Sequence, residues 1–192
     1  MIRAIVFDCF GVVVSDALEV LSERLRETDP AAAERVSELV RRGNRGLVDP
    51  AESSRQVAAV FGMSYEQYRA AIAAGEVKNA ELLGYIVELR RKYKTALLSN
   101  IGAGSLARRF SSDELHEHFD VVVASGDIGH VKPDKEAYLI TAERLGVAPE
   151  ECVFIDDRQP YCDGALATGM RTICYRDFVQ FQTELKAVLS AE

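Results

Sequence analysis

Five short apolar segments, rich in Val and Ile, constrain the fold of this chain more than any other feature of its sequence. They lie at residues 2–7, 95–99, 120–124, 152–155 and 171–175. Four of them are almost continuously apolar, as is expected of strands that are covered on both faces. Helical patterns such as residues 135–145 and 162–168 separate the later segments. This alternation predicts an α/β fold, with a Rossmann-like three-layer arrangement around a parallel sheet.

The segment between the first two predicted strands has a different character. From residue 15 to residue 80 we find no convincing strand, only amphipathic helical spacing. Asp49 and Ser64 have the pattern of helix starts, because each is followed three residues later by Glu or Gln. The stretch is too long for one crossover connection. We therefore expect a small helical cap over residues 15–80, inserted into a hydrolase core made of residues 1–14 and 81–192.

Charge and cysteine usage exclude several classes of function. The 192 residues include 23 basic and 30 acidic side chains, a formal charge of −7. This balance does not support binding of nucleic acid or of an anionic membrane, which use clustered Lys and Arg. No apolar run approaches the ~18 residues of a spanning helix, and the first residues lack the pattern of a signal peptide. The four cysteines form no C-x-x-C pair, so we expect reduced thiols and a cytoplasmic protein.

Polar side chains follow four of the predicted strands, at the point where each strand ends. In chain order they are Asp8, Ser99 with Asn100, Lys132, and the pair Asp156 and Asp157. The carboxyl ends of parallel strands meet at one edge of a sheet, where ligands of open α/β folds bind. We therefore expect these side chains to converge on one site.

Three carboxylates at one edge indicate a cation. At ~4 Å and an effective dielectric constant of ~20, each pair among Asp8, Asp156 and Asp157 would repel by about 4 kcal/mol. Hard oxygen ligands of this kind suit Mg²⁺. A carboxylate beside Mg²⁺ can attack a phosphoryl group and form an acyl phosphate, while Ser99 and Lys132 bind the non-bridging oxygens. The pattern predicts phosphoryl transfer with Asp8 as the nucleophile.

Taken together, these motifs resemble those of the haloacid dehalogenase superfamily of hydrolases. The first motif of that family is Asp-x-Asp-Gly-Thr/Val after an apolar strand, and residues 8–12 read Asp-Cys-Phe-Gly-Val. Ser99, Lys132 before Pro133, and the acidic pair at 156–157 match the later motifs in order and spacing. The resemblance covers about two thirds of the chain. It implies a Mg²⁺-dependent hydrolase whose cap is the helical insertion after the first motif.

The same resemblance implies a role for each site residue. Asp8 is the nucleophile, Ser99 and Lys132 are further catalytic groups, and the same two residues with Asn100 bind the substrate. The implied metal ligands are Asp8, the carbonyl oxygen of Phe10, Asp156 and Asp157. Residues 125–133 are most similar to the sugar-phosphate phosphatase branch, close to bacterial glucose-1-phosphate phosphatases. That similarity implies a small phosphorylated metabolite as substrate.

One position departs from the family pattern, because Phe10 stands where the second Asp of the first motif is expected. In family phosphatases that Asp protonates the leaving oxygen and later activates water, which is worth roughly 10²–10⁴-fold in rate. Haloacid dehalogenases carry an aromatic residue there, but they need no Mg²⁺ and lack the acidic pair found here at 156–157. We therefore expect a phosphatase, impaired unless His130 or the cap supplies another acid.

Two other functions stay open at this point. One is a metal-independent 2-haloacid dehalogenase, which the aromatic Phe10 favours. The other is a non-catalytic module that binds a phosphorylated metabolite or a protein partner. The cap contains no substrate signature, and its basic cluster of Arg41, Arg42 and Arg45 fits either a substrate contact or a solvated helix end. The sequence carries no signal for an oligomeric state.

Overall fold

A five-stranded parallel sheet forms the centre of the molecule. The computed structural model describes residues 1–190, and the strand order is β3-β2-β1-β4-β5. The strands are β1 (Ala4–Phe7), β2 (Lys94–Ser99), β3 (Val121–Ala124), β4 (Cys152–Asp156) and β5 (Arg171–Cys174). All five strands expected from the sequence are confirmed, with ends that differ by at most two residues. β1 is the central strand and lies between β2 and β4. The loops that follow these three strands therefore surround one crevice at the carboxyl edge of the sheet.

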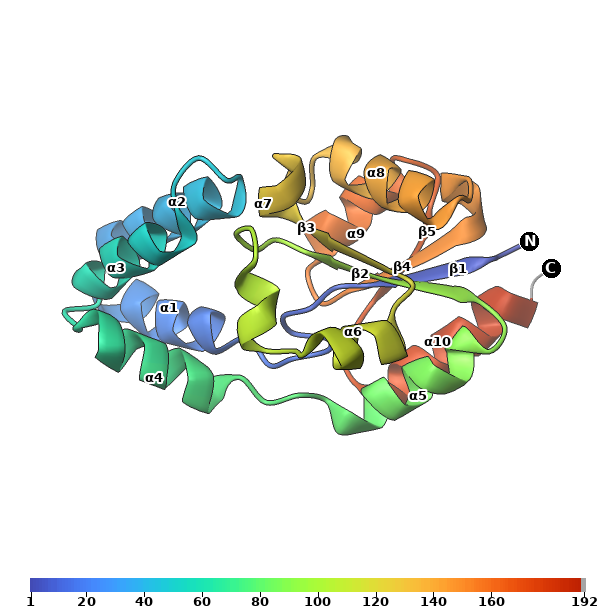
Figure 1. The fold of residues 1–192 in the computed structure, drawn as a ribbon, viewed down its shortest axis with the longest axis horizontal. Coiled ribbons are helices and arrows are strands. Elements are labelled where there is room, and N and C mark those ends of the chain that lie inside the picture. Colours follow the sequence, from blue (N-terminus) through green and yellow to red (C-terminus); the bar gives the residue numbers. More distant parts are fainter. Residues whose placement is uncertain (191–192) are drawn as a thin grey trace.

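Helices cover both faces of the sheet and complete the predicted three-layer α/β architecture (Figure 1). One face carries α5 (Ala80–Arg90), α6 (Ser112–His118) and α10 (Phe178–Ser190), and the other carries α8 (Lys135–Leu145) and α9 (Gln159–Leu166). Alternate β1 side chains serve the two layers: Phe7 packs in the cluster that includes Phe181 of α10, and Val6 packs with Tyr138 of α8. Within residues 1–190, no helix has both the length and the apolar character needed to cross a membrane.

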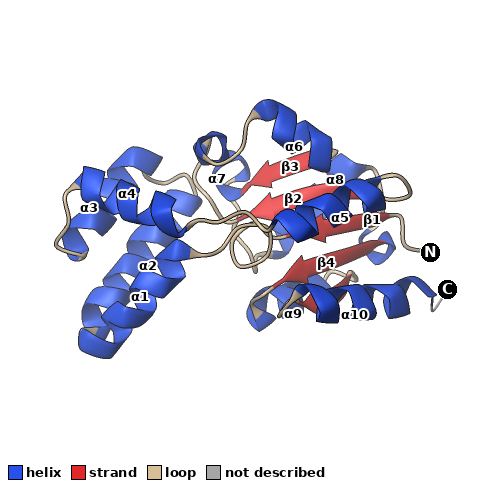
Figure 2. Cartoon of the chain, turned by 90° about the horizontal axis from the view of Figure 1, so that it is seen from below, coloured by secondary structure: helices blue, strands red, loops and turns tan. Residues whose placement is uncertain are grey.

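Four helices between β1 and α5 form a separate layer beyond the carboxyl ends of the strands (Figures 1 and 2). They are α1 (Ala17–Thr28), α2 (Pro30–Asn44), α3 (Pro50–Val60) and α4 (Tyr65–Gly75), and we call them the cap. The cap has a small apolar cluster of its own around Val36, Val57 and Tyr68. The expected helix starts are present, because Asp49 caps α3 and Ser64 forms a capping box with Gln67. The bounds 15 and 80 remain a prediction.

Two groups of contacts hold the cap against the sheet layers. The chain leaves and returns side by side, since the Ser15 hydroxyl donates to the Gly75 carbonyl at 2.6 Å and accepts from the Val77 amide at 2.8 Å. At the other end of the cap, Arg45 pairs with Asp134 at 2.8 Å, just before α8. Short helical segments η1 (Ser105–Arg108), α7 (Ser125–Ile128) and η2 (Pro149–Glu151) complete the fold.

Candidate active site

A buried lysine joins two of the predicted carboxylates. Lys132 Nζ donates to Asp8 Oδ1 and to Asp156 Oδ2, at 2.6 Å in each case. Asp8 follows β1, and Asp156 ends the neighbouring strand β4, so the sheet order places both carboxylates beside each other. The Lys132 and Asp156 side chains have no exposed surface. The structure therefore brings together three residues that are 124 and 24 positions apart in the chain.

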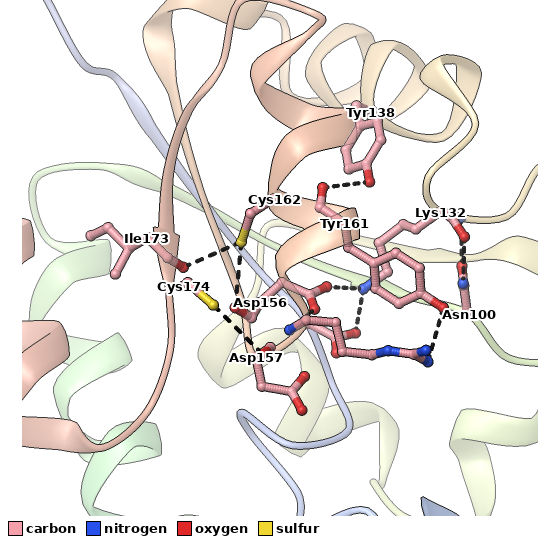
Figure 3. Close-up of polar contacts among 11 residues, drawn as sticks. Asn100, Lys132, Tyr138, Asp156, Asp157, Tyr161, Cys162, Ile173 and Cys174 are labelled. Carbon is pink, nitrogen blue, oxygen red and sulfur yellow. Dashed lines mark hydrogen bonds and ion pairs between the residues drawn. The ribbon is translucent and has the colours of Figure 1, made fainter.

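The third carboxylate, Asp157, lies at the exposed side of this cluster. One oxygen each from Asp8, Asp156 and Asp157 can be chosen so that all lie within 4.8 Å of one another. The Asp156 carboxylate points toward Lys132, whereas the Asp157 carboxylate points away from it (Figure 3). With all three carboxyl groups ionised and Lys132 charged, the cluster would carry an excess of two negative charges.

The raised pKa values of the carboxyl groups indicate that Lys132 alone does not compensate their negative charge. Burial raises the pKa of Asp8 to about 8, although the charge of Lys132 opposes the shift. Burial, followed by the charge of Asp156, raises the pKa of Asp157 to about 6. Burial alone would lower the pKa of Lys132, but Asp8 and Asp156 outweigh it and raise that pKa. Hard oxygen donors with this excess negative charge fit a divalent cation such as Mg²⁺.

Backbone features hold the acidic pair in place. Gly11 has a φ of +89°, and a Cβ atom there would lie 2.4 Å from Asp157 Oδ2, so the glycine of the first motif makes room for this carboxylate. The Cys162 and Cys174 thiols donate weak hydrogen bonds to the main-chain carbonyls of Asp156 and Asp157, at 3.5 and 3.6 Å (Figure 3). The two cysteines thus lie behind the acidic pair as free thiols.

The two polar residues after β2 differ in their surroundings. Ser99 is fully buried, and its hydroxyl has no hydrogen-bond partner among residues 1–190. Asn100 lines the cavity described below and is bound to the lysine loop, since it donates to the Lys132 carbonyl at 3.0 Å and accepts from the Lys132 amide at 2.8 Å. Its observed contact is therefore with the Lys132 backbone, and its predicted contact with substrate stays a prediction.

Phe10 places an aromatic ring where the family pattern has a carboxylate. The ring is partly buried, and the Arg109 guanidinium lies 4.9 Å from its centre. Arg109 is also paired with Glu76, whose oxygen is 2.5 Å away. The aromatic residue at this position thus stacks under a paired arginine, and its side chain offers no proton. Metal binding by the Phe10 carbonyl stays a prediction.

A cavity of about 480 Å³ lies between the cap and the carboxyl edge of the sheet. Asp8, Phe10, Asn100 and Lys132 line its sheet side. On the cap side it is lined by charged residues of α1, α2 and their flanks, which include Arg41 and Arg45 but not Arg42. The proposed nucleophile thus opens into a space that accommodates a small polar molecule.

Among the lining residues that were not sequence candidates are Asp16, Arg158 and Tyr161. The Tyr161 ring lies 5.1 Å from Lys132 Nζ, and the Arg158 guanidinium stacks 4.7 Å from the same ring. Arg158 directly follows the acidic pair, and its amide donates to Asp156 Oδ1 at 2.9 Å, so its position next to a motif was a usable signal. Asp16 carries no such signal, because an Asp before a helix is an ordinary cap.

Comparison with known proteins settles the family. Residues 2–167 match the family of haloacid dehalogenase-like hydrolases. The chain belongs to this family. Among solved structures, a predicted HAD-like family hydrolase from Porphyromonas gingivalis is 29% identical, with a TM-score of 0.75 over 96% of this chain and 98% of that one. The resemblance of the motifs to the haloacid dehalogenase superfamily is thereby confirmed.

Two other solved members of the family share the fold at lower identity. A HAD family enzyme from Bacteroides thetaiotaomicron, crystallised with magnesium and inorganic phosphate, has a TM-score of 0.75 at 23% identity over 94% of this chain and 99% of that one. L-2-haloacid dehalogenase from Xanthobacter autotrophicus has a TM-score of 0.63 at 22% identity, over 97% of this chain and 83% of that one. At these identities the likeness concerns the fold alone.

Curated relatives of the chain in this family include phosphatases. A phosphatase from Mycobacterium tuberculosis is 41% identical over 86 residues, which is 43% of this chain and 38% of the relative. Fructose-1-phosphate phosphatase from Escherichia coli is 37% identical over 62 residues, 32% of this chain and 33% of the relative. The matches with the first curated relatives span between 14% and 38% of the length of those proteins.

Proposed function

We propose that this HAD-like hydrolase is a Mg²⁺-dependent phosphatase of small phosphorylated metabolites of the sugar-phosphate type. The observation that carries the proposal is the buried cluster in which Lys132 bridges Asp8 and Asp156 beside Asp157. An anionic nucleophile with an adjacent cationic group and an excess of carboxylates suits attack on a phosphorus atom whose oxygens need charge compensation.

The reaction begins with the Asp8 carboxylate. Oδ1 is held by Lys132 at 2.6 Å, which orients the group and favours its ionised form, and the other oxygen attacks the phosphorus. An acyl phosphate forms on Asp8 as the bond to the leaving oxygen breaks, and water then hydrolyses it. Lys132 and the buried Ser99 hydroxyl, which has no hydrogen-bond partner within residues 1–190, bind the phosphoryl oxygens.

The metal site of this proposal uses Asp8, the Phe10 carbonyl, Asp156 and Asp157. Mg²⁺ held there supplies electrostatic stabilisation to the oxygens of the transferring group. Asp156 is already hydrogen-bonded through both of its oxygens, to Lys132 and to the Arg158 amide. Its main contribution is therefore to hold Lys132 and to add negative charge beside the more exposed Asp157.

The size and charge of the cavity support a small polar substrate. A cavity of about 480 Å³ whose lining includes arginines, carboxylates and a few apolar side chains suits a small molecule with several polar groups. The names of two curated relatives, the Escherichia coli fructose-1-phosphate phosphatase and the phosphorylated carbohydrates phosphatase from Thermotoga maritima, favour a phosphorylated sugar within that class.

The test replaces the nucleophile and keeps its shape. We expect Asp8→Asn to abolish hydrolysis of 4-nitrophenyl phosphate, because a neutral amide neither attacks phosphorus nor completes the metal site. Circular dichroism should show an unchanged fold, and the exposed Asp127→Asn should behave as wild type. In the wild-type protein, EDTA should stop turnover and added Mg²⁺ should restore it. Turnover by Asp8→Asn at the wild-type rate would contradict the mechanism.

The aromatic Phe10 favours one competing function, that of a 2-haloacid dehalogenase, and this function has its own test. A metal-independent 2-haloacid dehalogenase would release chloride from 2-chloropropionate in the presence of EDTA. The acidic pair argues against it, since Asp8, Asp156 and Asp157 leave an excess of negative charge that a haloacid anion would not compensate. A non-catalytic module would instead bind Mg²⁺ and phosphate without hydrolysing any member of a broad panel of phosphate esters.

A further inference from the structure

We propose that Asp16 is the general acid of this reaction and takes the place of the aspartate that Phe10 replaces. The inference rests on the proposed phosphatase function. It concerns the step in which an alkoxide leaving group needs a proton, a step that neither the Phe10 ring nor the paired Lys132 can serve.

Asp16 occupies the right place in the fold. It lies on the short connection from β1 to α1, eight residues after Asp8, and lines the same cavity as Asp8, Phe10 and Lys132. Its carboxyl group interacts electrostatically with Asp157 and with Arg158, both of which follow β4. Asp16 thus lies at the start of the first cap helix, on the wall of the cavity that Asp8 also lines. We place the leaving group of a phosphate ester in this cavity.

The other acidic residues of the cavity, apart from Asp8, are either paired with an arginine or exposed. Three are held in ion pairs: Glu19 with Arg26, Glu38 with Arg41, and Asp134 with Arg45. The oxygens of these three side chains are therefore already engaged by arginines. Glu34 is exposed on α2. Asp16 is half-buried and lies within ion-pair distance of no basic group in residues 1–190. His130, the other sequence candidate, does not line the cavity.

The environment of Asp16 favours the protonated form more than that of an ordinary carboxyl group. Burial raises its pKa, although the hydrogen bond from the Glu19 amide opposes the shift. That amide donates to Oδ1 at 2.9 Å and caps α1. A proton carried on Oδ2 leaves this hydrogen bond, and with it the start of the helix, in place.

The proton balance of the step is simple. When Asp8 attacks, the bond between phosphorus and the leaving oxygen breaks, and Asp16 gives its proton to that oxygen, so that a neutral alcohol departs and Asp16 becomes a carboxylate. In the second step Asp16 takes a proton from the attacking water as the Asp8–phosphorus bond breaks. Inorganic phosphate leaves, and both aspartates return to their starting forms.

The dependence of the rate on the leaving group distinguishes a general acid from a residue with a structural role. The test is to determine kcat/KM for 4-nitrophenyl phosphate and for a panel of alkyl and sugar phosphates. This parameter reports on the steps up to the departure of the leaving group. Asp16→Asn should lower kcat/KM for the alkyl esters by about 10²–10⁴-fold, because an alkoxide leaves only with a proton. The aryl ester should change by less than about threefold, because nitrophenolate leaves as an anion.

A second helix cap provides the matched control. Asp29 caps α2 by accepting from the Ala32 amide, and it lies outside the cavity, so Asp29→Asn should leave both classes of ester unaffected. Equal losses on aryl and alkyl esters in Asp16→Asn, or no loss on either, would overturn the inference. A wild-type protein that hydrolyses only aryl esters would overturn it and leave the proposed function standing. Failure of the wild type on both classes would overturn the proposed function, and this inference with it.

Discussion

At the scale of single residues, the site depends on Lys132 more than its position in a loop indicates. Its ammonium group contacts both buried carboxylates, those of Asp8 and Asp156. The Asn100 side chain donates to its main-chain carbonyl and accepts from its main-chain amide. Removing one partner from a buried ion pair leaves the other uncompensated, at a cost of roughly 3–5 kcal/mol. Asp8, Lys132 and Asp156 are therefore one unit, in which no single replacement is neutral.

Replacing Gly11 has two expected effects, backbone strain and displacement of the Asp157 carboxylate. Ala at this position takes up a strained φ of +89° and places Cβ 2.4 Å from Asp157 Oδ2, so the carboxylate must move. We expect Gly11→Ala to lose about 1–3 kcal/mol of stability and to need about tenfold more Mg²⁺ for half-maximal activity. Urea denaturation and a Mg²⁺ titration of phosphatase activity measure the two effects.

Gly62 is the matched position, because it also has a positive φ, +67°, but a Cβ atom there would have no neighbour within 4 Å. Gly62→Ala should lose stability and keep the wild-type dependence on Mg²⁺. If both variants kept that dependence, the close approach of Gly11 to Asp157 would have no part in metal binding.

At the scale of elements, one carboxylate joins two strands and a helix at the end of the sheet remote from the site. Asp120, just before β3, accepts from the Thr95 amide of β2 at 2.8 Å and from Arg90 at the end of α5, also at 2.8 Å. The same two strands are linked by the Asp120 amide, which donates to the Thr95 carbonyl at 2.9 Å. These contacts align β2 and β3, the strands whose loops carry Asn100 and Lys132.

The Asp120 contacts predict a pH-dependent loss of stability. Burial would raise the pKa of Asp120, but the hydrogen bonds from Arg90 and Thr95 outweigh it, so the folded-state pKa lies below the ordinary 3.8. A lowered pKa stabilises the fold above the ordinary value, and this contribution is lost as the pH falls through the folded-state value. Because Asp120 is exposed and solvent screens its contacts, Asp120→Asn should cost no more than about 1 kcal/mol at pH 7 and less in acid, as measured by urea denaturation.

Asp127 gives the comparison for this variant, because it is exposed and has no side-chain hydrogen bond or ion pair within residues 1–190. Asp127→Asn should leave stability unchanged at both pH values. A constant difference between wild type and Asp120→Asn from pH 7 down to pH 3 would show that the charge of Asp120 is not what stabilises these strands.

At the scale of the whole molecule, the cap and the sheet layers meet through polar contacts. Arg45 pairs with Asp134, and the Ser125 hydroxyl donates to the Asn44 carbonyl at 2.6 Å. Arg45 and Asp134 both line the cavity, as does Asn44. A polar interface of this kind resembles those that permit relative motion of the parts they join. We therefore expect changes to these few contacts to affect the binding of a substrate in the cavity.

The Arg45 pair predicts an effect on substrate binding rather than on the chemical step. Its partners are about one third exposed, at 34% and 28%, so the pair is worth no more than about 1 kcal/mol. Arg45→Gln should raise KM by about two- to fivefold and leave kcat and the melting temperature nearly unchanged. Arg42→Gln is the control from the same basic cluster, since Arg42 is exposed and does not line the cavity. A fall in kcat alone would contradict a role in closing the cap.

Much of the fold and part of the site were predictable from the sequence. The five apolar runs determine the strands because a strand buried on both faces requires a continuous apolar segment, and the helices between them require parallel pairing. Parallel pairing in turn brings the residues at strand ends to one edge, and this is why Asp8, Lys132 and Asp156 could be expected together. Local patterns sufficed wherever a signal lay within a few residues, as for the capping box of Ser64.

Only the tertiary structure decided which other side chains enter the site. The cavity exists because the cap lies over the edge of the sheet, and whether Asp16 is a plain helix cap or also a cavity residue depends on that placement. The stacking of Arg109 on Phe10 joins residues 99 positions apart, and the pairing of Arg45 with Asp134 joins residues 89 apart. Such contacts arise from the packing of whole elements. The sequence by itself thus predicted that Asp8, Lys132 and Asp156 lie together, whereas the packing of the cap decided which side chains line the cavity in front of them.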